Sequence, residues 1–301
     1  MNRKNRIAHQ KIITNFAIYK EIFTMEFRTK VEIAPSSWQI KPAQRLLFIG
    51  SCFAENIGKK FKDEQFPTVI NPFGVMYNPA SILHSVERHC QTSDFVPDIA
   101  FLTLGTNHVY MLKETKEIVD NCQKRPQSLF EEQELSVAQC VDYLQKATQC
   151  LLSCNPNMHI IITVSPIRYR KYGFHGSQLG KATLLLAAEM QTHESQVDYF
   201  PAYEIMNDEL RDYRFYKEDM LHPSPQAVEY IWEQFAETYF HADVFTMMRE
   251  WKPIKEALHH RPFNPESEDY QAFMALTKER LTTFMKKYSL SPWPLPKEGG
   301  E

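Results

Sequence analysis

The stretch RLLFIGSCFAENIGKKF, residues 45–61, decides the fold expected for this chain. Its apolar run LLFI predicts a buried strand, and the helical spacing of residues 53–64 predicts a helix directly after it. Gly50 allows a sharp turn between the two, so Ser51 and Cys52 stand where the strand ends and the helix begins. The N–H groups of a helix N-terminus favour a thiolate and help to hold an oxyanion. Either residue is therefore a candidate nucleophile, with a buried Cys52 and a helix-capping Ser51 as the simpler alternative.

Short apolar runs rich in β-branched residues alternate with stretches of helical spacing along the chain. The further runs are 66–73, 99–105, 159–166 and, less regularly, 197–206, and the helical stretches are 79–90, 136–153, 177–194 and 224–240. Strands that are apolar along their whole length and alternate with helices are typical of a parallel sheet covered on both faces. We therefore expect an α/β fold, a three-layer α/β/α sandwich with a central parallel sheet.

Polar residues gather directly after the apolar runs, at the edge where open α/β sheets bind their ligands. Gly74 follows the second run and Asn107 the third, so the Gly74 N–H and the Asn107 amide are candidate oxyanion donors. Both also have a simpler interpretation, as residues of a turn or a helix cap. Arg168 and Lys181 follow the fourth run. They are candidates to bind an anionic part of a substrate or a coenzyme A phosphate, with solvated surface charge as the alternative.

A candidate base lies late in the chain, in the segment EDMLHPSPQAVEYIWEQF. Asp219 stands three residues before His222, and a proline and a predicted helix follow. On a tight turn, a carboxylate at this spacing reaches Nδ1 of the imidazole and leaves Nε2 free to take a proton from a nucleophile. An Asp-x-x-His is a weak signal by itself in a chain with 11 histidines. The HPS segment and the helix behind it strengthen the signal.

These four blocks, in this order on one predicted edge, resemble the SGNH (GDSL-type) hydrolase superfamily. More narrowly, the segments FIGSCFAENIG, NPFGVMYNPASI, LTLGTNHVY, TVSPIR and DMLHPS are similar to the GSCFA family, a bacterial branch of it. The resemblance runs from about Met25 to about residue 240. It implies a flavodoxin-like α/β/α fold, and it implies hydrolase activity through the superfamily.

The resemblance assigns roles residue by residue. Gly50 matches the Gly of Gly-Asp-Ser, which places Ser51 at the Asp and Cys52 at the Ser. The other matched positions are Gly74, Gly105 and Asn107 of the Gly-x-Asn, and Asp219 and His222 of the final pair. The sequence departs from the superfamily in two places, because a thiol replaces the nucleophilic hydroxyl and His108 replaces the Asp that follows Asn107.

A thiolate that attacks an acyl carbon forms a thioester, which can pass its acyl group to water or to another acceptor. We therefore expect an acyl-ester hydrolase or an acyltransferase that acts on carbohydrate or small esters. His222 takes the proton of Cys52, and Asp219 orients His222. Gly74, Asn107 and the Cys52 N–H hold the oxyanion. Ser51 is the nucleophile instead if the turn is shifted by one residue.

Two other hypotheses follow from the sequence. The replaced residues of the first block are compatible with a non-catalytic carbohydrate- or acyl-binding module that keeps the fold. A metal-dependent hydrolase is the third hypothesis, since His84, His89 and Cys90 lie close together, but their spacing on one helix matches no known ligand set. We therefore expect neither a metal nor a cofactor.

The composition excludes some classes of partner. The chain has 301 residues, 43% of them hydrophobic, and a net charge of −3, so nothing electrostatic predicts binding to nucleic acid or to an anionic membrane. No segment approaches the ~20 apolar residues that span a bilayer. Six cysteines without a metal-ligand rhythm indicate reduced thiols in a cytoplasm.

Three regions follow from the patterns along the chain. Residues 1–24 are interpreted as an N-terminal extension upstream of a natural start at Met25, because MEFRTKVEIAP reads like the beginning of a domain. Residues 25–245 form the expected α/β/α domain. Residues 246–301 form a helical appendage with a loose tail rich in Pro and Gly, in which Ser267 is a plausible N-cap.

Overall fold

Five parallel strands form the central sheet, in the order β2-β1-β3-β7-β8. The computed structural model of the protein describes residues 27–120, 122 and 125–290. The strands are β1 (Leu46–Gly50), β2 (Thr68–Ile70), β3 (Ile99–Leu104), β7 (His159–Val164) and β8 (Val197–Tyr199). Every residue of β1 and β3 is buried, as their apolar sequences predict. The expected parallel sheet is confirmed.

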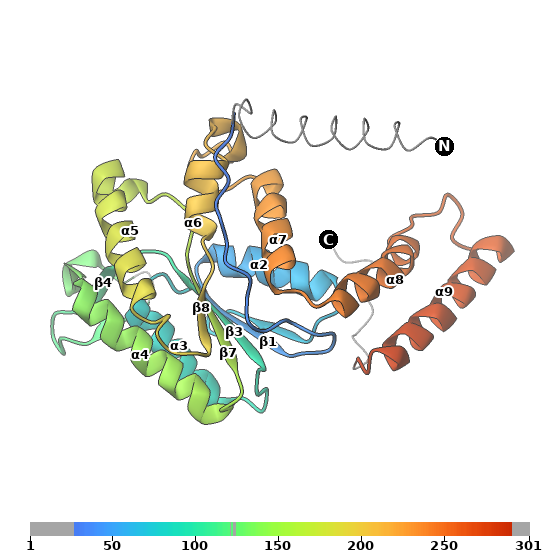
Figure 1. The fold of residues 1–301 in the computed structure, drawn as a ribbon, viewed down its shortest axis with the longest axis horizontal. Helices are drawn as coiled ribbons and strands as arrows, with labels where there is room; N and C mark the ends of the chain where they lie inside the picture. Colours follow the sequence, from blue (N-terminus) through green and yellow to red (C-terminus); the bar gives the residue numbers. More distant parts are fainter. Residues whose placement is uncertain (1–26, 121, 123–124, 291–301) are drawn as a thin grey trace, which may run out of the picture.

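Helices cover both faces of this sheet and complete the three layers (Figure 1). One layer contains α3 (Pro79–Thr92), α4 (Val137–Cys154) and α5 (Gly173–Glu189), and the other contains α2 (Cys52–Asp63) and α7 (Pro225–Tyr239). Successive residues of β1 point to opposite layers, since Phe48 packs with α2 and α7 and Ile49 packs with α3 to α5. The predicted α/β/α sandwich is confirmed.

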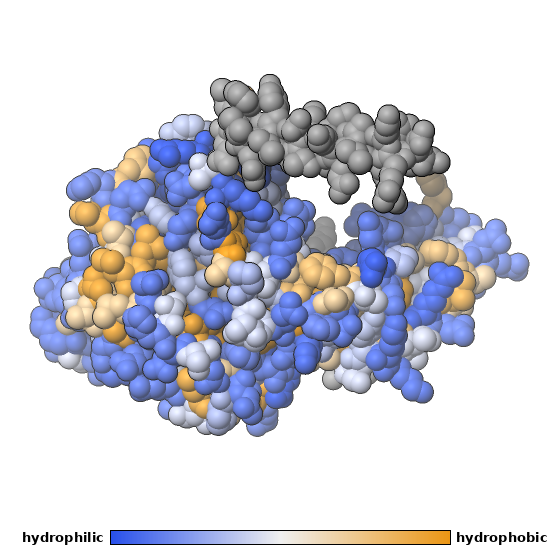
Figure 2. All heavy atoms as spheres, in the orientation of Figure 1, coloured by the Kyte–Doolittle hydropathy of each residue, from blue (hydrophilic) through white to orange (hydrophobic). Residues whose placement is uncertain are grey.

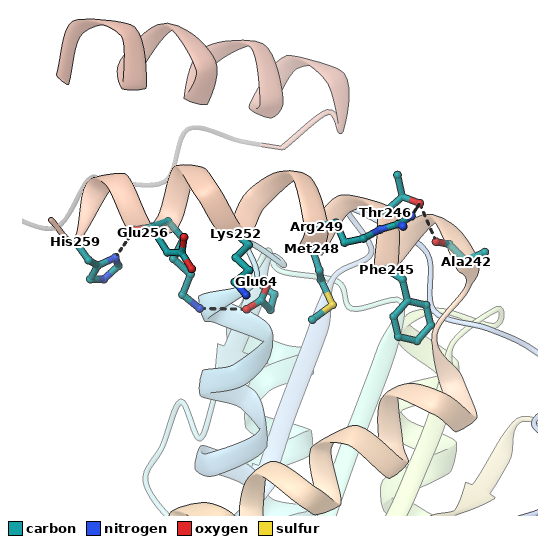
Figure 3. A pocket seen from close by; sticks show the side chains of 10 residues that line it. Glu64, Ala242, Phe245, Thr246, Met248, Arg249, Lys252, Glu256 and His259 are labelled. Atoms are coloured by element: carbon teal, nitrogen blue, oxygen red, sulfur yellow. Dashed lines mark hydrogen bonds and ion pairs between the residues drawn. The ribbon is translucent and has the colours of Figure 1, made fainter. Parts of the chain in front are cut away.

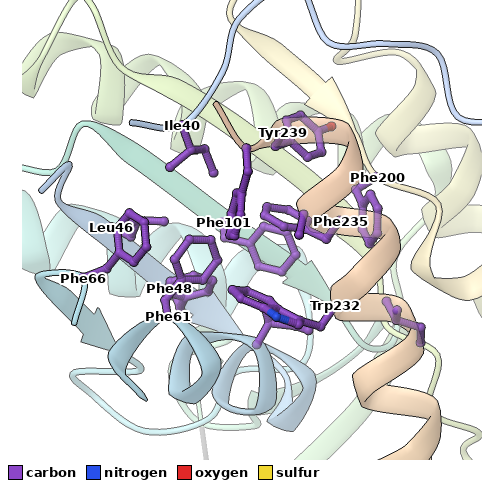
Figure 4. Close-up of a cluster of buried hydrophobic side chains, with 14 of the residues drawn as sticks. Ile40, Leu46, Phe48, Phe61, Phe66, Phe101, Phe200, Trp232, Phe235 and Tyr239 are labelled. Atoms are coloured by element: carbon purple, nitrogen blue, oxygen red, sulfur yellow. The ribbon is translucent and has the colours of Figure 1, made fainter. Parts of the chain in front are cut away.

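An aromatic cluster fills the layer between the sheet and the α2–α7 pair (Figure 4). The ring centroids of Phe48 and Phe101 are 5.4 Å apart, and those of Phe61 and Trp232 are 4.9 Å apart in an edge-to-face arrangement. Each large side chain buried in this way contributes roughly 1.5–3 kcal/mol. This cluster fixes α2, and with it the first residue of α2, Cys52, against the sheet.

A small antiparallel sheet lies outside the sandwich and is absent from the sequence prediction. It has the order β5-β4-β6, with β4 (His108–Leu112), β5 (Ile118–Val119) and β6 (Phe130–Glu134). The β6 sequence FEEQE carries three carboxylates and only its first residue is buried, so it shows no apolar run. Pairing with β4, rather than burial, makes it a strand.

Two predicted strands are shorter than expected. The run 66–73 forms a strand only over β2, because Asn71 adopts a φ of +40° and Pro72 follows it. The run 197–206 forms a strand only over β8. Beyond Pro201 the chain turns into a short helix, α6 (Ala202–Glu204), and a π-helical turn, η3 (Ile205–Glu209).

Two helices follow the sandwich, α8 (Ala242–Leu258) and α9 (Glu268–Lys287). They pack on each other through Trp251 and Phe284, whose rings stack at 5.4 Å, and Ser267 caps α9 as expected. The boundary placed after residue 245 stays a prediction. The extension 1–24 and the tail 291–301 lie outside the described residues. Among the described helices none is long and apolar enough to cross a membrane.

Apolar side chains gather on the side of the molecule where α5 lies (Figure 2). Leu179, Leu186 and Met190 are all more than half exposed there. The spacing of these residues places them on one stripe of the helix.

Candidate active site

The turn between β1 and α2 is built around close contact with β3. Gly50 has a φ of +138°, and a Cβ at this position would lie 2.2 Å from the Thr103 carbonyl oxygen. Only glycine fits such an approach. The next residue, Ser51, donates its N–H to Thr103 Oγ1 at 2.7 Å. The turn is therefore rigid, as a nucleophile turn must be.

Ser51 is fully buried and is the N-cap of α2. Its hydroxyl accepts the Phe53 N–H at 3.2 Å and shares a hydrogen bond of 3.0 Å with the Thr103 hydroxyl. The hydroxyl thus has structural partners on both sides. This geometry corresponds to the capping interpretation of Ser51 rather than to an exposed nucleophile.

Cys52 is the first residue of α2 and is only partly buried. Burial raises the pKa of its thiol, and the charge of Glu55 raises it further. Three groups lower the pKa of the thiol: the Cys52 backbone N–H and the ammonium groups of Lys217 and Lys181. At rest the thiol is protonated at neutral pH, so it needs a base to act as a nucleophile.

Asp219 and His222 form the pair expected from the sequence. Asp219 Oδ2 lies 2.6 Å from His222 Nδ1, and Asp219 Oδ1 accepts the N–H groups of Leu221 and His222 at 2.8 and 3.0 Å. These N–H groups and the imidazole lower the pKa of Asp219 to about 2. A carboxylate held in this way fixes one imidazole tautomer, with Nε2 free to accept a proton.

One residue of the loop that carries this pair acts electrostatically on Cys52. Lys217 donates its N–H to the His222 carbonyl at 2.8 Å, and the charge of Lys217 acts on the Cys52 thiol. Arg168 holds the other side of the loop, because its guanidinium donates to the Met220 carbonyl at 3.2 Å and its N–H to the Leu221 carbonyl at 3.1 Å. Arg168 therefore positions the loop, a role that the sequence analysis did not assign to it.

The two predicted oxyanion donors are already engaged within the protein. The Gly74 N–H donates to the Asn71 carbonyl at 2.9 Å in a turn. The Asn107 side chain is 3% exposed and donates to the Leu135 carbonyl at 2.9 Å. Asn107 thus joins β4 to the segment after β6, and Gly74 corresponds to its simpler interpretation as a residue of a turn. The Gly74 N–H and one of the two N–H groups of the Asn107 amide therefore already have acceptors within the protein.

Lys181 is not at the surface, so its interpretation as solvated surface charge is wrong, and its role in binding an anionic group stays a prediction. It is 2% exposed, and its Nζ donates to the carbonyls of Gly105 and Ser165, each at 2.7 Å. These carbonyls end β3 and β7, so Lys181 links the carboxyl ends of two neighbouring strands. Burial lowers the pKa of Lys181 to about 7, and an ionised Cys52 acts in the opposite direction. Apolar neighbours on α5 hid this role from sequence reasoning.

Two tyrosines that the sequence analysis missed complete the surroundings of the thiol. An ionised Cys52 raises the pKa of both Tyr77 and Tyr169, and burial raises each pKa more. Their rings meet edge to face at 6.1 Å. Both follow strands of the central sheet, Tyr77 after β2 and Tyr169 after β7, and this position after an apolar run was the signal that could have identified them.

Two hollows of the surface bear on the site. The larger, about 980 Å³, lies between the end of α2 and α8 and contains none of the candidate residues (Figure 3). A second, about 530 Å³, borders the loop of the Asp219–His222 pair. Its lining is mainly polar and aromatic and includes Arg168, Asn207, Tyr203 and Tyr216. We call this second hollow the dyad groove, because Arg168 in its lining holds the loop of the Asp219–His222 pair; neither the pair itself nor Cys52 lines it.

The proposed metal cluster does not form among the described residues, where no group of three potential ligands could hold a metal ion. His84 instead pairs with Asp120 at 2.8 Å, and His89 Nε2 lies 2.9 Å from the Phe95 carbonyl. Cys90 contacts the Cys150 carbonyl on α4.

Known proteins were compared with the chain. The GSCFA family matches residues 45–98 and 91–235, and the GSCFA domain protein, C-terminal domain, matches residues 251–292. No curated protein matches the chain in sequence.

Several solved structures resemble the chain at low identity. One, assigned as a GDSL-like lipase from Parabacteroides merdae, is 13% identical over 66% of this chain and 96% of its own, with a TM-score of 0.46. Another, assigned as a platelet activating factor from Streptococcus pneumonia, is 18% identical over 65% and 84%, with a TM-score of 0.43. A carbohydrate esterase of family 3 from Talaromyces cellulolyticus is 11% identical over 68% and 99%, with a TM-score of 0.39.

Proposed function

The chain belongs to the GSCFA family, and we propose that it is an acyl-ester hydrolase or acyltransferase in which Cys52 is the nucleophile. One observation carries the proposal. The Asp219–His222 pair, closed at 2.6 Å, lies on a loop whose Lys217 acts electrostatically on the Cys52 thiol. A nucleophile at a rigid turn, a base, and a carboxylate that orients the base are the parts that covalent acyl transfer requires.

In the proposed reaction, His222 Nε2 takes the thiol proton as Cys52 Sγ attacks the acyl carbon. A C–S bond forms, and the carbonyl π electrons move to the oxygen. The intermediate then collapses to a thioester as the C–O bond breaks, and His222 returns the proton to the leaving alcohol. Water or another acceptor attacks the thioester with the same base, which releases the acyl product and restores the thiol.

The dyad groove supports a polar leaving alcohol. Tyr203 and Tyr216 offer aromatic faces, and Asn207 and Arg168 offer planar polar groups that donate hydrogen bonds. A carbohydrate or a small polar alcohol suits such a lining better than a long acyl chain does. The proposal covers both fates of the acyl group, hydrolysis by water and transfer to another acceptor.

Turnover of a short-chain nitrophenyl ester tests this proposal, measured for the wild type and for three single variants. We expect Cys52→Ala and His222→Ala to lower kcat/KM by about 10²-fold or more, because each removes a group that acts on the reacting bonds. Ser51→Ala should keep most of the turnover but lower the free energy of unfolding by about 1–2 kcal/mol, since it removes the cap of α2. Equal turnover by all four proteins would end the proposal.

A second candidate function is a non-catalytic carbohydrate- or acyl-binding module. The observation in its favour is the raised pKa of Cys52, since an activated thiol ordinarily has a lowered one. This candidate predicts that acetylated sugars raise the unfolding temperature without turnover, and that Cys52 reacts with iodoacetamide no faster than a free thiol. Thermal denaturation with and without the sugar, beside the alkylation rate, distinguishes the two functions.

A further inference from the structure

A tetrahedral intermediate at Cys52 needs hydrogen-bond donors, and of the three expected from the sequence, the Cys52 N–H, the Gly74 N–H and the Asn107 amide, two already donate within the protein. The Gly74 N–H and the Asn107 amide both donate to carbonyl groups of the protein, at 2.9 Å in each case. Removal of one oxyanion donor typically costs about 10²–10³-fold in kcat. An oxyanion held by more than the Cys52 N–H therefore requires a further donor near the thiol.

The Tyr169 hydroxyl is buried and has no hydrogen-bond partner among the described residues. It lies over Gly105 at the carboxyl end of β3, where a Cβ on Gly105 would be 2.3 Å from the hydroxyl oxygen. The missing side chain of Gly105 thus makes the space that the hydroxyl occupies. A buried hydroxyl without a partner costs roughly 1–3 kcal/mol, so its position calls for an explanation.

The tyrosine is held in place from several sides. Its N–H donates to Ser177 Oγ at 3.1 Å, and its ring meets Tyr77 edge to face. Lys181 Nζ lies 5.2 Å from the ring centroid and is itself anchored on the Gly105 and Ser165 carbonyls. A side chain fixed in this way places its hydroxyl without further reorganisation, which is the condition for electrostatic stabilisation of a transition state.

The thiol and the tyrosine lie within electrostatic reach of each other. Ionised Cys52 raises the pKa of Tyr169, and burial raises it more, so that the pKa is well above the ordinary value for tyrosine. The hydroxyl therefore keeps its proton at neutral pH and stays a hydrogen-bond donor.

We propose that the Tyr169 hydroxyl donates a hydrogen bond to the acyl oxygen in the tetrahedral intermediate at Cys52, in place of the engaged Gly74 and Asn107 donors. This inference rests on the proposed function. The hydroxyl loses no proton in the step. The hydrogen bond forms to the oxygen that gains charge as the C–S bond forms; when the intermediate collapses, that electron pair re-forms the carbonyl, and the leaving oxygen takes the C–O bonding pair and the proton from His222.

Two reactions of the same thiol separate this role from a structural one. Attack of Cys52 on nitrophenyl acetate creates an oxyanion, whereas alkylation by iodoacetamide displaces iodide and creates none. Mass spectrometry of the full chain measures both rates, and the first needs only a single acylation rather than turnover. We expect Tyr169→Phe to slow acylation about 10²-fold and to change the alkylation rate by less than about threefold.

The matched control is Tyr172→Phe, which removes a hydroxyl three residues away that donates to Glu132. It should leave both rates near those of the wild type. A Tyr169→Phe protein that acylates at the wild-type rate overturns the inference. A Tyr169→Phe protein that loses both reactions alike also overturns it, because this result indicates a general disturbance of the thiol.

The failure of the proposed function has a separate signature. If the wild-type Cys52 is not acylated at all, or if Cys52→Ala turns over esters normally, the nucleophile assignment fails and this inference fails with it. If Cys52→Ala is inactive and Tyr169→Phe is fully active, only the inference about Tyr169 fails.

Discussion

Neighbouring residues at the end of β1 have divided roles. Ser51 is fully buried, and its hydroxyl caps α2 and forms a hydrogen bond with the Thr103 hydroxyl. Cys52 begins the helix with its sulfur only partly buried and within reach of two lysines. The same strand-to-helix turn therefore assigns one side chain to the structure and leaves the next one available for chemistry.

Asp219 offers a test at the scale of one residue. Asp219→Asn keeps the shape of the loop but reverses the preferred imidazole tautomer, so we expect kcat/KM to fall about 10²-fold or more. The wild-type carboxyl, with a pKa of about 2, stays ionised throughout the neutral and mildly acidic range. Its contribution to stability is present above the unfolded pKa of about 4 and is lost as the pH falls through about 2. A pH–rate profile checks that Asp219 stays ionised in the mildly acidic range. An acid limb that is present in the wild type and disappears in Asp219→Asn would contradict this ionisation.

At the scale of elements, the carboxyl ends of β3 and β7 are joined by a buried amine. The parallel ladder between these strands ends at Leu104 and Val164. Just beyond it, the Lys181 amine from α5 donates hydrogen bonds to the carbonyls of both strands' next residues. Buried carbonyls left without donors are costly. Lys181 therefore stabilises the edge on which Gly105, Tyr169 and Cys52 meet.

Lys181→Met should lower the free energy of unfolding by about 2 kcal/mol or more, because two buried carbonyls lose their donor. Lys146→Met, which removes an exposed i,i+4 ion pair with Asp142, should cost less than about 0.5 kcal/mol. Urea denaturation measures both.

The pH adds a second signature for Lys181. Since the native pKa of Lys181 is about 7 and the ordinary pKa of lysine is 10.5, the unfolded chain binds more protons between these values, and the stability contributed at this site rises with pH. We expect the difference between the wild type and Lys181→Met to grow from pH 7 to pH 9. A constant difference across this window would contradict the buried position.

At the scale of the whole molecule, the described chain has two cores on the two faces of one sheet, and the α8–α9 pair extends the α2–α7 face. None of the proposed catalytic groups lies on α8 or α9. The family likewise treats residues 251–292 as a separate C-terminal unit. We therefore expect that weaker packing of the α8–α9 pair leaves the proposed catalytic groups undisturbed.

Phe284→Ala tests this separation. Phe284 is 4% exposed and stacks on Trp251, so its truncation should cost about 3–5 kcal/mol of local stability. Amide hydrogen exchange in α9 should accelerate, while ester turnover stays within about twofold of the wild type. Phe273→Ala, which removes a ring 41% exposed on the same helix, should change neither. A parallel loss of turnover in Phe284→Ala would show that the pair supports the site.

The sequence by itself determined the sandwich, the turn between β1 and α2 that carries the proposed nucleophile, and the Asp219–His222 spacing. These features depend on local patterns: apolar runs, helical periodicity, caps, and a carboxylate three residues before an imidazole. The ends of β2 and β8 were predicted too late in the chain, because Asn71 and Pro201 end these strands through backbone conformation rather than through a change in hydropathy.

Only the tertiary structure decided which polar groups are free. Asn107 and Gly74 carry the expected chemistry, yet Leu135 and Asn71 already accept their hydrogen bonds. Lys181 and Tyr169 both follow an apolar run, but that position does not show that packing between α5 and the ends of β3 and β7 buries the Lys181 amine and the Tyr169 hydroxyl. Burial and hydrogen-bond partners come from elements far apart in the chain, so their effect on a donor, a pKa or a nucleophile appears only when those elements meet.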